Sequence, residues 1–87
     1  MAIFLIVPTL PGDGISKALE AHKLNIPYYP LPHGEFLVSF KGTSKELSDL
    51  LGISEGKTGS AIVAAISSYF GRASTDIWEW VQVHWEG

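Results

Sequence analysis

The segment GISEGKTGS, residues 52–60, resembles a phosphate-binding loop. Its glycines with Lys57 and Thr58 read G-x-x-x-G-K-T, one residue shorter than the spacing that cradles nucleotide phosphates. Such a loop needs a helix after it, so that helix N-terminal N–H groups face the phosphate. Here a strong helical pattern precedes the loop, over residues 43–51, and presents its negative carbonyl end. The pattern therefore predicts a helix stop and a solvated turn rather than a nucleotide site.

The three histidines, His22, His33 and His84, are the other side chains that commonly bind metals or transfer protons. No two of them have the spacing of a metal-binding pair such as H-x-x-x-H, and the chain contains no cysteine. We therefore expect no metal site and no cofactor. The lack of cysteine also excludes disulfide bonds.

Several loops that the expected topology brings to one end of the sheet carry polar side chains. The set comprises Thr9, Asp13, His33, Glu35, Lys57 and Thr58. A histidine beside carboxylates is able to act as an acid–base pair, but loop ends are polar in most proteins. We interpret Asp13, His33, Lys57 and Thr58 as a possible ligand rim and assign no catalytic residue. This favours a non-enzymatic protein and leaves an enzyme open.

The aromatic side chains are densest near the C-terminus, where Trp78, Trp80 and Trp85 follow Tyr69 and Phe70. Aromatic rings close to a basic residue such as the nearby arginine are able to stack on nucleic-acid bases. Rings of this kind also fill open sheet faces and subunit interfaces, where aromatic residues are enriched. The pattern favours packing over base stacking.

Composition restricts the class of partner. The 87 residues are 46% hydrophobic and 17% charged, with a net charge of -3. The low charged fraction predicts an unusually apolar surface and hence a protein partner or a self-interface. The negative charge argues against binding nucleic acid through overall charge, so nucleic acid is a weaker expectation. The N-terminal MAIFLIVP is too short for a signal peptide or a membrane span, which predicts a cytoplasmic location and no membrane partner.

The pattern of apolar and turn residues predicts the elements of a single domain, residues 1–87. We expect strands over 3–7, 28–31 and 35–40, with the second at an edge because Pro27 precedes it and Pro30 lies within it, and helices over 14–23 and 43–51. Thr43 and Glu46 have the spacing of a capping box, and Gly52 follows as the stop. Residues 60–70 fit a strand or a helix, as do residues 77–85; we choose strand for the former and helix for the latter.

The resulting order is that of the ferredoxin-like βαββαβ fold, an α+β antiparallel sheet, with an extra C-terminal helix. The first and third strands are apolar on both faces, as is the expected fourth with Val63 against Ile62 and Ile66, whereas two helices cover only one face. The other face requires the C-terminal helix, a second subunit or both. We therefore expect a homodimer, with Phe4, Ile6, Trp78, Trp80 and Trp85 as interface candidates.

The stretches IFLIV, GEFLVSFKGTSKELSDLLG, SAIVAAIS and IWEWV resemble small ferredoxin-like bacterial proteins that are distantly similar to the small CRISPR-associated endonuclease family. Nucleases of that family carry an aspartate at the end of the first strand, which binds a metal between two subunits. The corresponding position here is Val7-Pro8-Thr9, which offers no carboxylate. The resemblance thus implies the fold and dimerisation but not the nuclease chemistry.

The function expected from the sequence is that of a small non-enzymatic binding protein of unassigned pathway. One alternative is a divergent or degenerate metal-dependent nuclease of the resembled type. Another is an inhibitor protein of the kind that phages and mobile elements encode.

Overall fold

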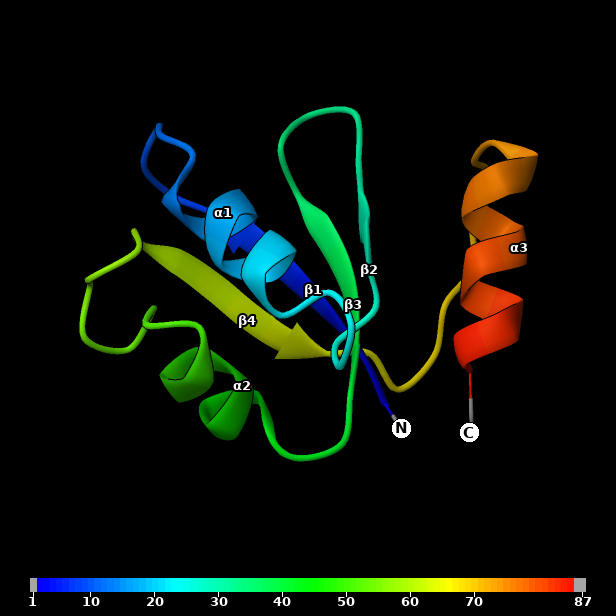
Figure 1. The fold of residues 1–87 in the computed structure, drawn as a ribbon. Helices are drawn as coiled ribbons and strands as arrows, with labels where there is room; N and C mark the ends of the chain where they lie inside the picture. The colour runs from blue at the N-terminus through cyan, green and yellow to red at the C-terminus, as the bar shows by residue number, and fades with distance from the viewer. Residues whose placement is uncertain (1, 86–87) are drawn as a thin grey trace.

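The fold consists of a four-stranded antiparallel sheet and three helices in a computed structural model that describes residues 2–85. The elements follow in the order β1 (Ala2–Pro8), α1 (Gly14–Ala21), β2 (Tyr28–Pro30), β3 (Phe36–Phe40), α2 (Ser44–Leu50), β4 (Ala61–Ala65) and α3 (Thr75–His84), as Figure 1 shows. The two ambiguous segments therefore form the predicted strand, β4, and the predicted helix, α3.

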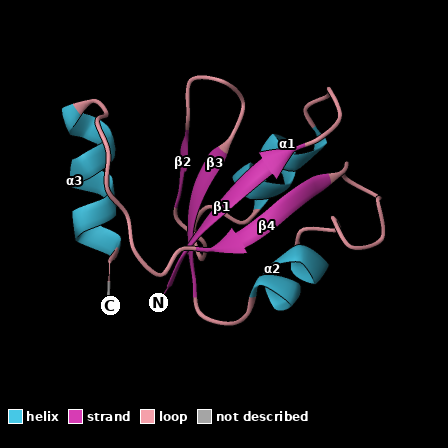
Figure 2. Ribbon diagram, turned by 180° about the vertical axis from the view of Figure 1, so that it is seen from behind, coloured by secondary structure: helices cyan, strands magenta, loops and turns pink. Residues whose placement is uncertain are grey.

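The sheet has the strand order β2-β3-β1-β4, with every neighbouring pair antiparallel (Figure 2). β1 lies inside the sheet, where Phe4 is opposite Val38 of β3 and also opposite Ala65 of β4. β2 is one edge, as Pro27 and Pro30 predict, because proline cannot donate a ladder hydrogen bond. β4 is the other edge.

The main core lies between one face of the sheet and the helices α1 and α2. Its buried members are Phe4, Ile6, Ile15, Leu19, Ile26, Phe36, Val38, Leu47, Leu51 and Ile53. The capping box of α2 is confirmed: the Thr43 hydroxyl accepts from the Glu46 N–H at 3.1 Å, and the Glu46 carboxylate accepts from the Thr43 N–H at 2.9 Å. Gly52 then ends the helix with a φ of 77°, a backbone conformation that favours glycine.

The second face of the sheet is partly covered by α3. Ile3, Leu37 and Val81 form a smaller buried cluster there, with Trp80 and Trp85 packed against it. Of the covers expected from the sequence, the C-terminal helix therefore supplies one, over the region around β1 and β3.

Two of the interface candidates lie on the other side of the sheet. Phe4 and Ile6 are 1% and 0% exposed in the main core beneath α1 and α2, so neither is available to a partner. Alternation along β1 instead places Ile3, Leu5 and Val7 on the second face. The sequence does not distinguish the two sets because both are apolar.

Candidate functional site

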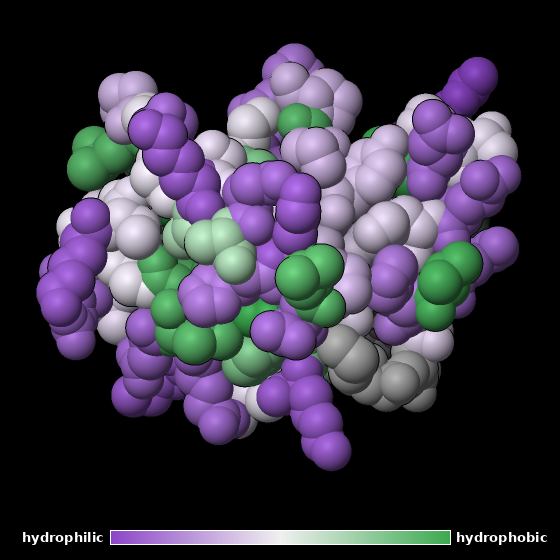
Figure 3. All heavy atoms as spheres, in the orientation of Figure 1, coloured by the Kyte–Doolittle hydropathy of each residue, from purple (hydrophilic) through white to green (hydrophobic). Residues whose placement is uncertain are grey.

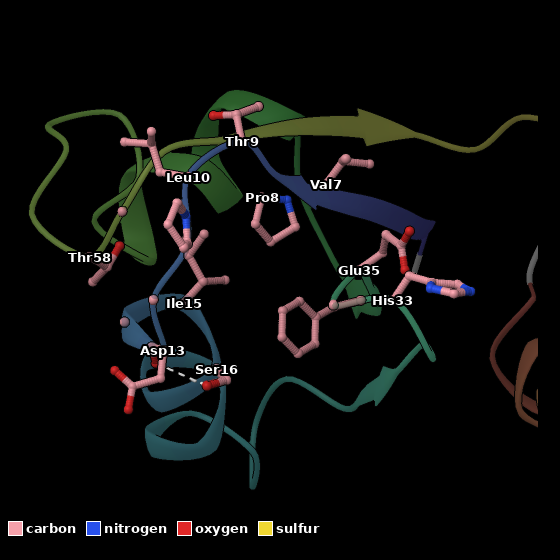
Figure 4. A pocket seen from close by; sticks show the side chains of 16 residues that line it. Val7, Pro8, Thr9, Leu10, Asp13, Ile15, Ser16, His33, Glu35 and Thr58 are labelled. Atoms are coloured by element: carbon pink, nitrogen blue, oxygen red, sulfur yellow. Dashed lines mark hydrogen bonds between the residues drawn. The ribbon is translucent and has the colours of Figure 1, made fainter.

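A cavity lies at the end of the sheet where β1 leads into α1. It has a volume of about 580 Å³ and extends from the loop before α1 to the β2–β3 hairpin. Three of the four predicted rim residues, Asp13, His33 and Thr58, line it together with Thr9 and Glu35 (Figure 4). The topology therefore brings these loops to one end of the sheet, as expected.

The fourth predicted rim residue, Lys57, is not part of this cavity lining. Its ammonium group lies 2.9 Å from the Glu55 carboxylate, and both side chains are largely exposed. Consecutive loop residues diverge here because Thr58 turns back toward the helix: its hydroxyl donates a 2.8 Å hydrogen bond to the Leu51 carbonyl.

The loop over residues 52–60 has little free donor capacity for a phosphate. The N–H groups of Lys57 and Thr58 both donate to the Gly52 carbonyl, at 3.0 and 3.3 Å. A phosphate-binding loop needs such N–H groups free and directed at the ligand. The geometry matches the predicted helix stop and turn.

The backbone at the start of α1 passes very close to the backbone of the turn over residues 52–60. A Cβ atom on Gly14 would collide with the carbonyl of Thr58, so only glycine fits there. Asp13 occupies the N-cap position of α1, but its side chain makes no capping hydrogen bond and instead pairs with Lys17 at 3.2 Å. The Ser16 hydroxyl donates to the Asp13 carbonyl at 2.9 Å.

The polar residues of the cavity lie on opposite rims. Figure 4 shows Asp13 and Ser16 on the α1 side, His33 and Glu35 together on the hairpin side, and Pro8 between the two rims. Residues 2–85 contain no group of three or more histidine, aspartate or glutamate side chains placed to hold a metal ion. The cavity has the size of a small-molecule site, but its polar groups do not converge on one point.

The aromatic cluster packs largely on itself and on the second face. Tyr69 stacks on Trp78 with ring centroids 5.6 Å apart and meets Trp85 edge-on at 4.8 Å, while Trp80 stacks on His84 at 4.2 Å. Trp78 and Trp85 also line an apolar cavity of about 230 Å³ between α3 and the sheet. These three tryptophans are half-buried, in agreement with packing as their main role, whereas Phe70 is fully exposed.

The interface candidates expected from the sequence do not include the outer part of the second face, at β4. Ile62 of β4 lies opposite Val7 of β1 and is 62% exposed, and Ala64 beside it is also exposed. Neither Val7 nor Ile62 belongs to the cluster that α3 covers. We define the sheet surface formed by Val7, Ile62 and Ala64 as the β4 surface. The signal in the sequence was an expected strand with apolar residues on both faces, Val63 on one and Ile62 on the other.

On the opposite face α2 lies beside β4, and Figure 3 shows hydrophobic side chains over this region among hydrophilic ones. Leu50 of α2 is 47% exposed.

None of the helices within residues 2–85 combines the length and apolar character needed to cross a membrane. Comparison with known proteins adds no assignment: the chain matches no protein-family model, no curated protein and no solved structure.

Proposed function

We propose that this chain is a small, non-enzymatic interaction protein with a ferredoxin-like domain that works as a homodimer. The observation that carries the proposal is the β4 surface, an apolar part of the sheet that α3 leaves uncovered. The ferredoxin-like assignment is supported by the βαββαβ element order and by the antiparallel strand order β2-β3-β1-β4.

Binding is a better account of this surface than catalysis. Contiguous exposed apolar patches, in contrast to single apolar side chains, mark contacts with other macromolecules, and Ile62 and Ala64 are neighbours on one face of β4. In the sheet-end cavity, by contrast, His33 and Glu35 share one rim and Asp13 lies on the opposite rim, so the three groups do not converge on one reacting atom as acid–base chemistry needs. The unusually low charged fraction, 17%, agrees with a protein that buries part of its surface in a partner.

The experiment is sedimentation equilibrium of the intact chain over a wide concentration range. We expect the mass to approach twice the 9.5 kDa of the chain as the concentration rises. A mass that stays at one chain at the highest concentration would refute the homodimer.

A matched pair of variants then tests the β4 surface. Ile62→Lys places a charge on this surface and should shift the mass toward the monomer. Leu24→Lys makes the same chemical change in the loop after α1, at a side chain that is 92% exposed, and should leave the mass unchanged. If the two variants had the same mass in sedimentation equilibrium, a role for the β4 surface in dimerisation would be contradicted.

A further inference from the structure

The hydrogen bonds that flank β4 determine which of its backbone groups point away from the sheet. The Ile66 N–H donates to the Ile3 carbonyl at 2.9 Å, and the Thr9 N–H donates to the Ser60 carbonyl at 2.8 Å. In an antiparallel ladder, residues that exchange hydrogen bonds alternate with residues that do not. The even-numbered residues of β4 therefore bond to β1, and the N–H and C=O groups of Ala61, Val63 and Ala65 point outward.

We propose that two copies of this chain pair through these outward groups, β4 against β4, in an antiparallel arrangement about a two-fold axis at Val63. This inference rests on the proposed homodimer and specifies its geometry. The two four-stranded sheets then form one continuous sheet across the dimer.

The register of this pairing follows from the positions of the outward-pointing N–H and C=O groups of β4. With the axis at Val63, this residue is opposite its own copy, and Ala61 is opposite Ala65 of the second copy. All three outward-pointing residues are then in hydrogen-bonded pairs, each of which exchanges two bonds. An axis at Ile62 or at Ala64 keeps only two such pairs, because one outward-pointing residue loses its partner.

The side chains on the β4 surface agree with this register. Ile62 of one copy is opposite Ala64 of the other in a non-hydrogen-bonded pair, where side chains approach most closely. A large side chain thus meets a small one on both sides of the axis, and the 62% exposed Ile62 is covered. An axis at Ile62 would instead oppose two isoleucines.

The charge of this segment is compatible with a second copy as the occupant. No residue from Thr58 to Gly71 is charged, so the two paired strands place no like charges opposite each other although the chain has a net charge of -3. The edge also lacks the lysine, proline or bulge that usually prevents strand pairing. About a two-fold axis, both copies contribute the same five-residue edge in antiparallel directions, so the edge is complementary to itself.

The test is crosslinking of a single-cysteine variant in the intact chain. Because the chain contains no cysteine, Val63→Cys introduces the only thiol, and its Cα would lie about 5.5 Å from its copy, within disulfide range. We expect Val63→Cys to oxidise to a covalent dimer much faster than Leu24→Cys at equal concentration. If the wild-type chain is a dimer but both variants crosslink at the same rate, this pairing is overturned while the homodimer remains.

A second variant does not depend on disulfide geometry. Ala61→Pro removes one outward N–H group and leaves the bonds to β1 in place, because edge strands tolerate proline where the N–H points away. Each dimer would lose two symmetric hydrogen bonds, so we expect its Kd to rise about tenfold. An unchanged Kd, with a circular dichroism spectrum equal to that of the wild type, would overturn the pairing.

Discussion

The hydroxyl of Tyr28 donates a 2.7 Å hydrogen bond to the carboxylate of Glu20, which joins β2 to α1. The same carboxylate also accepts from Lys23 at 2.6 Å. The hydrogen bonds from Lys23 and from Tyr28 lower the pKa of Glu20 below its usual value, and the bond to Glu20 raises the pKa of Tyr28.

A pH dependence of stability follows from these two shifts. The lowered pKa of Glu20 means that the stabilisation is present above the usual pKa of a glutamate and is lost as the pH falls through the folded value. The raised pKa of Tyr28 means that the stabilisation is present below the usual pKa of a tyrosine and is lost as the pH rises through the folded value. Glu20→Gln should therefore lower the Tm slightly at pH 7, with the difference from the wild type shrinking below about pH 4. Thermal unfolding followed by circular dichroism measures this, and a difference that does not change with pH would contradict it.

The close approach of Gly14 to Thr58 leads to a second prediction. Helix propensity alone predicts that Gly14→Ala, at the first residue of α1, stabilises the chain by up to about 1 kcal/mol. The collision of the new Cβ with the Thr58 carbonyl predicts the opposite sign, a loss of about 1–3 kcal/mol. Urea denaturation decides between them, and a more stable variant would show that the loop and the turn do not meet as described.

The docking of α3 leads to a third prediction. Val81 is 5% exposed in the cluster on the second face, whereas Val83 of the same helix is 78% exposed. Val81→Ala should lower the free energy of unfolding by about 1–2 kcal/mol, because it removes buried methyl groups and enlarges the cavity beneath the helix. Val83→Ala changes the helix propensity equally and serves as the control. Equal stability of the two variants in urea would show that α3 does not dock through Val81.

The hydroxyl of Ser39 leads to a fourth prediction. Ser39 is fully buried in β3, and its hydroxyl has no hydrogen-bond partner within the described part of the chain. A buried polar group without a partner costs its desolvation free energy. Ser39→Ala should therefore be neutral or raise the free energy of unfolding by about 1 kcal/mol, as measured by urea denaturation. A clear loss of stability would show that the hydroxyl is bonded.

Local patterns in the sequence were sufficient to predict most elements and their ends. The spacing of Thr43 and Glu46 predicts the start of α2, Gly52 predicts its stop, and the prolines around β2 predict an edge strand. These features depend on neighbours in the chain: a cap bonds three residues ahead, and proline lacks an N–H wherever it lies. The sequence predicts these features because the interacting groups lie close together in the chain.

The tertiary structure decided which residues face which partner. β1 is apolar on both faces, so only its register with β3 and β4 shows that Phe4 and Ile6 belong to the main core and that Val7 lies on the β4 surface. Lys57 and Thr58 are adjacent, yet only Thr58 lines the cavity, because its hydroxyl bonds back to the end of α2. Contacts between residues far apart in the chain determine these outcomes, and alternation or loop composition alone does not encode them.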